Sequence, residues 1–226
     1  MLTDIQYAYL VWCGLFALVW VGLYAARRDA RREMLIMSVI GAILGPLAQI
    51  FYIRDYFAPT TITGTPIGIE DALIGFLIGG ISAALYELWL WDRVERPAKA
   101  GVLSLVVVAL VLSTAWMFIA VFYLGIPSVY ASTIFLMVIG VSMITYRPRL
   151  AKNAVYSGVL LTVFFFLFYQ LYFWLYPDIV DAWWYLSNVS GIIFINVPLE
   201  EYLWAVSWGF GAGPASELVA RMRFLR

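Results

Sequence analysis

Histidine is absent from this chain of 226 residues, and cysteine occurs once, as Cys13. Without histidine the chain lacks the imidazole ligands of zinc, haem and non-haem iron sites, and it lacks a histidine base to activate a nucleophile. A single cysteine cannot form a disulfide within the chain and argues against a cysteine-based metal site. The sequence therefore predicts no metal site and no other cofactor.

Charged residues are also scarce, at 12% of the chain, whereas a soluble domain carries about 25%. Fourteen basic residues balance 14 acidic ones, so no net positive charge attracts nucleic acid. Apolar residues make up 64% of the sequence. This composition predicts an integral membrane protein whose surface contacts lipid.

Seven apolar segments are long enough to form membrane-spanning helices, which need about 20 residues each. They cover residues 5–26, 33–53, 69–91, 101–123, 130–146, 153–176 and 198–220. The stretch 181–197 is polar and aromatic, and it is expected to be an interfacial or re-entrant loop with Trp183 and Trp184 at headgroup depth. The expected fold is an all-α membrane protein of about seven transmembrane helices.

Basic residues fall in every second connection between these segments. They are Arg27, Arg28, Arg31, Arg32, Arg93, Arg96, Lys99, Arg147, Arg149, Lys152, Arg221, Arg223 and Arg226. Of the 14 basic residues, only Arg54 lies on the opposite side. Because basic residues favour the cytoplasmic side, the pattern places the N-terminus outside the cell membrane and the C-terminus in the cytoplasm.

Polar residues recur at constant offsets, which indicates an internal repeat. The pair Glu70-Asp71 recurs 130 residues later as Glu200-Glu201. Four further pairs share that offset: Leu73 with Leu203, Gly79 with Gly209, Glu87 with Glu217, and Leu88 with Leu218. At an offset of 121, Arg28 matches Arg149 and Gln49 matches Gln170. One membrane domain, 1–226, is thus expected to contain two parallel three-helix repeats, 1–92 and 130–226, joined by a linker helix within 93–129 (3+1+3).

The two acidic pairs open the third and seventh helices at the outer side, where they could converge on one cavity. Adjacent helical residues point about 100° apart, so one acid of each pair suffices to face it. Gln49 and Gln170 lie near the same depth. As an alternative, all four acids are ordinary N-terminal residues that interact with the helix dipole.

Two further acids, Glu87 and Glu217, follow 17 residues later, roughly 25 Å along a helix and therefore on the cytoplasmic side. Ionisable residues within membrane segments are often functional, so both are candidate pocket residues. Glu217 has Arg221 four residues on and could form a simple surface pair instead.

A buried carboxylic acid that stays protonated can act as a general acid. In a lipid-accessible pocket it could add a proton to an alkene, and aromatic faces would stabilise the carbocation. The aromatic candidates for this pocket are Tyr86, Trp89, Trp91, Trp183, Trp184, Trp204 and Trp208. Since 18% of the chain is aromatic, packing or an interfacial belt is the alternative role for them.

Three segments resemble signatures of the lycopene cyclase domain family of actinobacteria, archaea and fungi. Residues 66–71 (Pro-Ile-Gly-Ile-Glu-Asp) and 79–87 (Gly-Gly-Ile-Ser-Ala-Ala-Leu-Tyr-Glu) are similar to the first-half signature. Residues 198–201 (Pro-Leu-Glu-Glu) are similar to the second-half signature, although Gly68 stands where the second half has Pro198. The basic loop 27–34 is also similar, and the resemblance covers residues 20 to 220 apart from the linker helix.

The resemblance implies an isomerase that closes the ends of a linear carotenoid into ionone rings, by proton addition and loss without net redox change. It implies a lipophilic substrate within the bilayer and acid roles for Glu70, Asp71, Glu200 and Glu201. The ring type, the donor acid of each pair, the exact carotenoid and the oligomeric state, including a homo-oligomer, stay open.

A small transporter or binder of 3+1+3 layout, with paired carboxylates as its site, is the alternative. Such transporters carry an adjacent Pro-Gln pair, whereas Pro46 and Gln49 are three residues apart here. An opsin is excluded because its retinal needs a lysine in the last helix, and the two lysines, Lys99 and Lys152, lie in predicted loops.

Overall fold

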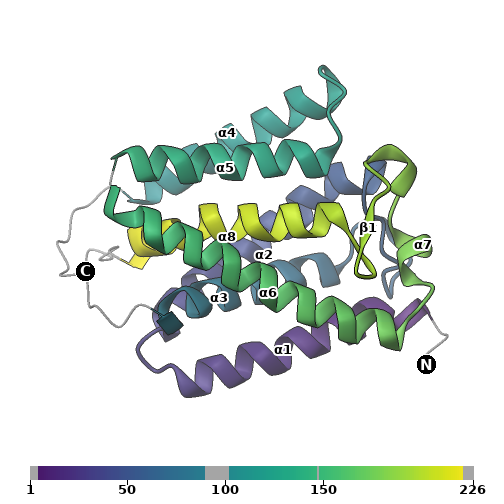
Figure 1. Cartoon of the computed structure of the whole chain (residues 1–226), viewed down its shortest axis with the longest axis horizontal. Helices are drawn as coiled ribbons and strands as arrows, with labels where there is room; N and C mark the ends of the chain where they lie inside the picture. Colours follow the sequence, from purple (N-terminus) through teal and green to yellow (C-terminus); the bar gives the residue numbers. More distant parts are fainter. Residues whose placement is uncertain (1–4, 90–101, 147, 221–226) are drawn as a thin grey trace.

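The computed structural model describes residues 5–89, 102–146 and 148–220. Within these ranges seven long helices account for most of the chain (Figure 1). They are α1 (Ala8–Ala26), α2 (Arg31–Asp55), α3 (Ile69–Trp89), α4 (Val102–Phe122), α5 (Ser128–Tyr146), α6 (Ala151–Leu175) and α8 (Leu199–Ala220). Each coincides with one predicted segment to within a few residues at either end.

Four helical stretches in the described part are long and apolar enough to cross a membrane. They are Ile5–Ala26, Arg31–Asp55, Ser128–Tyr146 and Ala151–Leu175. The described part of the chain is therefore mainly helical, and these four helices are compatible with the membrane protein that the composition predicts.

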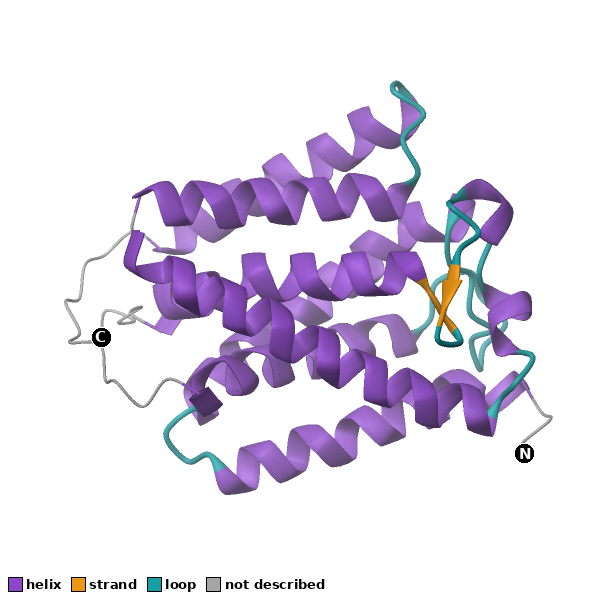
Figure 2. Ribbon diagram, viewed as in Figure 1, coloured by secondary structure: helices purple, strands orange, loops and turns teal. Residues whose placement is uncertain are grey.

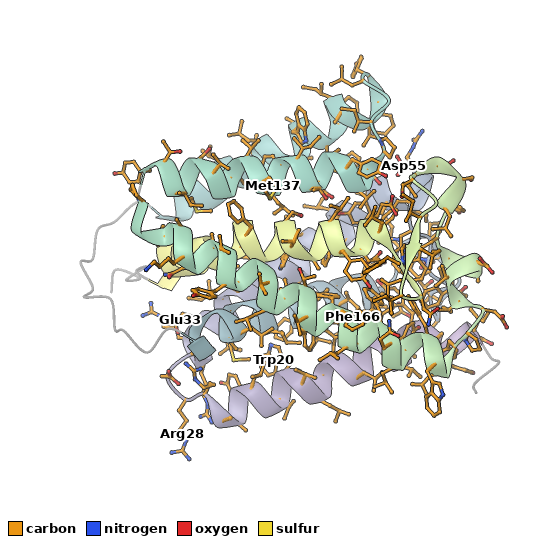
Figure 3. All side chains as sticks on the ribbon, viewed as in Figure 1. Trp20, Arg28, Glu33, Asp55, Met137 and Phe166 are labelled. Atoms are coloured by element: carbon orange, nitrogen blue, oxygen red, sulfur yellow. The ribbon has the colours of Figure 1, made fainter. Side chains whose placement is uncertain are left out.

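The connections alternate between two ends of the helix bundle. The α1–α2 and α5–α6 connections lie at one end, at the left of Figure 1, and the α2–α3, α4–α5 and α6–α8 connections lie at the other. Figure 3 accordingly places Arg28 and Glu33 at the left and Asp55 at the right. We call the right-hand end, which carries Asp55, the loop end.

Two helices, α3 and α8, make most of the contacts between elements. The first packs against α1 and α2, and the second packs against α5 and α6. Contacts of α3 with both α6 and α8, and of α2 with both α5 and α8, join the two groups. The helix α4 lies beside α5 at one side of the bundle (Figure 1).

Glycines allow α2 and α3 to touch along their backbones. A Cβ at Gly41 would overlap the carbonyl oxygen of Gly75, and a Cβ at Gly75 would overlap that of Gly41. One turn away, Gly45 packs against Asp71 and Gly75 in the same way. Small residues spaced four apart are typical of helices that approach closely within membranes. This contact fixes the rotation of α3 and hence the direction of its acidic residues.

The α6–α8 connection contains short elements: α7 (Ile179–Trp183), a single turn at Leu186–Asn188, and the strands β1 (Ile193–Phe194) and β2 (Val197–Pro198). The strands form an antiparallel pair at the loop end (Figure 2). Trp183 and Trp184, which were expected at headgroup depth, are buried within the protein, with only 1% and 3% of their surface exposed.

The cause of this burial is a clip between the two loops at that end. The backbone N–H of Ala58 donates to the carbonyl of Trp183 at 2.8 Å, and the N–H of Tyr185 donates to the carbonyl of Tyr56 at 2.9 Å. With the backbones joined, both indoles turn inward onto an aromatic core. In that core the rings of Trp12 and Trp183 stack with centroids 6.4 Å apart.

Candidate active site

A cavity of about 330 Å³ lies between the helices, with walls from every long helix. Its lining extends along α2 from Met37 to Tyr52 and along α8 from Glu201 to Ala212. At 1.5 Å per residue these stretches span roughly 22 Å and 17 Å. The cavity is therefore elongated along the helices, and its lining is mostly aliphatic and aromatic.

Two of the four predicted acids, Asp71 and Glu201, line this cavity. Asp71 stands in the first turn of α3, and Glu201 stands in the first turn of α8. Both are buried, with 3% and 6% of their surface exposed. Two helices that start at the loop end thus bring two carboxyl groups to the same end of one apolar cavity.

Asp71 accepts two hydrogen bonds. The hydroxyl of Tyr9 on α1 donates to Oδ1 at 2.8 Å, and the backbone N–H of Gly68 donates to Oδ2 at 2.7 Å. The second bond caps the N-terminus of α3, because the side chain of Asp71 reaches back to the backbone N–H of Gly68 just before the helix. The first bond ties α1 to the acid.

Glu201 accepts three hydrogen bonds, all from side chains. Trp184 donates from its indole nitrogen to Oε1 at 2.7 Å. Tyr56 donates its hydroxyl to the same oxygen, and Tyr169 donates to Oε2. All four residues line the cavity.

The other two predicted acids, Glu70 and Glu200, are not among the residues that line the cavity. Both are fully buried and turn toward the loops. The backbone N–H of Ile62 donates to Glu70 at 2.7 Å. The N–H of Ser190 donates to Glu200 at 2.9 Å, and Tyr130 on α5 donates its hydroxyl to the same oxygen at 2.6 Å. The 100° step between adjacent helical residues separates the two acids of each pair.

The two predicted glutamines also differ. Gln49 lines the cavity and donates from Nε2 to the carbonyl of Phe57 at 3.0 Å. Gln170 is not among the lining residues, and its amide donates to the carbonyl of Ile195 at 2.7 Å. Both amides therefore hold loop backbone, and only Gln49 does so at the cavity wall.

Trp204 and Trp208 line the cavity, as predicted for aromatic pocket residues, and their rings stack with centroids 5.6 Å apart. Five further side chains predicted for the pocket lie outside the described residues: Tyr86, Glu87, Trp89, Trp91 and Glu217.

The tyrosines that donate to the two acids at the cavity wall were not among the predicted site residues; they are Tyr9, Tyr56 and Tyr169. Nothing in their spacing distinguishes them from the other 12 tyrosines of the chain. Within the described residues, no group of three or more Asp, Glu or Cys side chains is placed to hold a metal ion. The chemistry available at the cavity is thus that of carboxyl, phenol and indole groups beside apolar surface.

Comparison with known proteins gives a match in the second half of the chain. Residues 127–218, which include α5, α6 and most of α8, match the family model described as Lycopene cyclase. No curated protein and no solved structure matches the chain. The matched segment contributes Glu201, Tyr169 and Trp184 to the cavity. Residues 127–218 of the chain are therefore similar to the lycopene cyclase family.

Proposed function

We propose that this protein is a carotenoid cyclase that closes the ends of a linear, lycopene-type polyene into ionone rings. The observation that carries the proposal is the pair Asp71 and Glu201, which come from different helices and line one apolar, aromatic cavity. The lycopene cyclase domain at 127–218 supports the same activity at the level of the family.

The proposed chemistry needs one proton donor and one proton acceptor. A carboxylic acid adds a proton to the terminal double bond, the ring closes, and a carboxylate removes a proton to form the new double bond. The intermediate carbocation needs a site without water and with π faces nearby. Trp204, Trp208 and Trp12 provide such faces at the cavity wall. Proton addition and loss balance, so no redox cofactor takes part.

We also propose the 3+1+3 arrangement, with α1–α3 and α5, α6 and α8 as equivalent units and α4 as the linker. In support, α3 packs on α1 and α2 as α8 packs on α5 and α6. Gln49 and Gln170, 121 residues apart, both bind loop carbonyls. The basic α1–α2 and α5–α6 connections share one end of the bundle, which we assign to the cytoplasm.

The direct test is expression in bacteria that accumulate lycopene, followed by chromatography of the extracted carotenoids. We expect monocyclic or bicyclic products from the wild-type chain. The Asp71→Asn variant should form none of them, although it is present in the membrane in the same amount. Unconverted lycopene with wild-type protein present in the membrane would contradict the proposal and favour a 3+1+3 transporter or binder.

A further inference from the structure

The carboxylate of Glu201 is held at both oxygens by donors from three separate elements. Tyr56 directly follows α2, Tyr169 lies on α6, and Trp184 directly follows α7. Tyr56 and Trp184 bind Oε1 while Tyr169 binds Oε2. The three donor residues are 2–3% exposed, so water does not compete for these bonds. With both oxygens bound, these hydrogen bonds hold the carboxylate in one orientation at the cavity wall.

The donors to Glu201 are all neutral. Among the described residues, no lysine or arginine forms an ion pair with it. Hydrogen bonds donated to a carboxylate favour its ionised form. Three neutral donors therefore suit an ionised Glu201 that has no positive partner among the described residues. A substrate carbocation in the cavity would supply that positive charge.

Asp71 has a poorer set of donors, one phenol and one backbone N–H. Because donated hydrogen bonds favour the ionised form of a carboxyl group, the smaller donor set suits a carboxyl group that holds a proton. When two carboxyl groups of one site lie in different environments, one can act as the acid and the other as the base.

On the basis of the proposed function, we propose that Asp71 donates the proton and that Glu201 removes it. In this scheme Tyr56, Tyr169 and Trp184 are positioning residues. They hold the carboxylate of Glu201 beside the newly closed ring. The position of this carboxylate decides which ring isomer forms.

In the reaction, Asp71 gives its proton to the CH carbon of the terminal double bond, which leaves a tertiary cation at the dimethyl carbon. The π electrons of the methyl-substituted double bond further along the chain then form the ring bond, and the cation moves to the methyl-bearing ring carbon. Glu201 takes a proton from a carbon next to that cation. Removal from the ring CH that bears the polyene gives a β ring, and removal from the ring CH₂ gives an ε ring.

Each ring closure transfers one proton from Asp71 to Glu201. Exchange of that proton through water, back to Asp71, restores the starting state before the next polyene end binds. The substrate and product are isomers, so the cycle needs no oxidant, reductant or further reactant. A fixed Glu201 reaches one of the two competing C–H groups, and a loosened Glu201 reaches both.

The test uses conservative variants of the full chain in lycopene-accumulating cells. Tyr56→Phe combined with Tyr169→Phe removes two donors and keeps both rings. We expect at least a tenfold slower conversion and a changed ratio of β to ε rings. The control is Tyr172→Phe, which removes a buried hydroxyl that binds the carbonyl of Ala8 and not an acid. An unchanged rate and ring ratio in the double variant would overturn the positioning role.

A second comparison tests the two acid roles. We expect only unreacted lycopene from Asp71→Asn, because no cation forms. We expect Glu201→Gln to yield small amounts of mixed ring isomers or hydroxylated rings, because a cation that forms without its base loses a proton elsewhere or captures water. The reverse pattern, or unreacted lycopene from a membrane-inserted Glu201→Gln, would overturn the assignment. If the wild-type chain forms no rings, the proposed function itself fails.

Discussion

Tyr9 and Asp71 are joined by a hydrogen bond of 2.8 Å from the phenol of α1 to the carboxyl of α3. Tyr9 is 3% exposed and is not among the residues that line the cavity, whereas Asp71 is. Tyr9 therefore donates to Asp71 from the side of the carboxyl group that faces away from the cavity. It holds Asp71 toward the cavity, while the neighbouring Glu70 binds the loop at Ile62.

Replacing Tyr9 with phenylalanine should slow cyclisation without weakening substrate binding. A hydrogen bond to such a group contributes about 1–3 kcal/mol, so its loss frees the acid to leave its reactive position. We expect kcat to fall roughly tenfold with KM unchanged, because each 1.36 kcal/mol corresponds to about a factor of ten. Conversion rates measured in membranes over a range of lycopene concentrations separate the two constants. A raised KM at unchanged kcat would show that Tyr9 contacts the substrate instead.

Glu70→Gln and Glu200→Gln should keep activity and lose stability. Both side chains bind loop N–H groups, and their second oxygen, Oε2, is buried without a hydrogen-bond partner among the described residues. Glutamine would place an unsatisfied NH₂ group there, at a cost of about 1–3 kcal/mol. Thermal unfolding in detergent should show a lower midpoint for both variants, while ring formation at low temperature persists. Complete loss of ring formation in well-folded protein would show instead that these two acids take part in the reaction.

The seven helices could be predicted because an apolar run of about 20 residues is a strong signal in itself. The position of both acid pairs at helix starts followed from the same segmentation. Which acid of each pair faces the cavity could not be predicted. That choice depends on the rotation of each helix, and for α3 the backbone contact between Gly41 and Gly75 fixes it.

The partners of the acids were beyond prediction for a different reason. Tyr56 and Tyr169 are 113 residues apart in the chain, and each meets Glu201 only through tertiary packing. In a sequence with 18% aromatic residues, a single tyrosine carries no signal of its own. The burial of Trp183 and Trp184 was equally beyond prediction, because it depends on the clip between two loops that are far apart in the sequence.

The contact between α2 and α3 predicts a strong effect of a single methyl group. In Gly75→Ala the new Cβ would meet the backbone oxygen of Gly41, and neither backbone can move without separating the helices. Overpacking of this kind costs about 1–3 kcal/mol. The matched control is Gly14→Ala on α1, whose Cβ would meet no atom of the described residues within 4 Å. A reduced unfolding midpoint for the first variant alone is the expected outcome, and equal midpoints would contradict the close contact.

The length of the cavity predicts a position far from the acids where bulk should block a long substrate. Ala212 lines the cavity on α8, 11 residues or roughly 17 Å beyond Glu201. A polyene whose end reaches Asp71 and Glu201 must run past this position, so Ala212→Phe should lower kcat/KM at least tenfold. The control Leu18→Phe adds a ring on α1 at a side chain that is 73% exposed, and it should leave the rate unchanged. A short polyene with the same end group, which stops before Ala212, should still cyclise in the Ala212→Phe variant. Equal loss for the short and long polyenes would mean that the substrate follows another path to the acids.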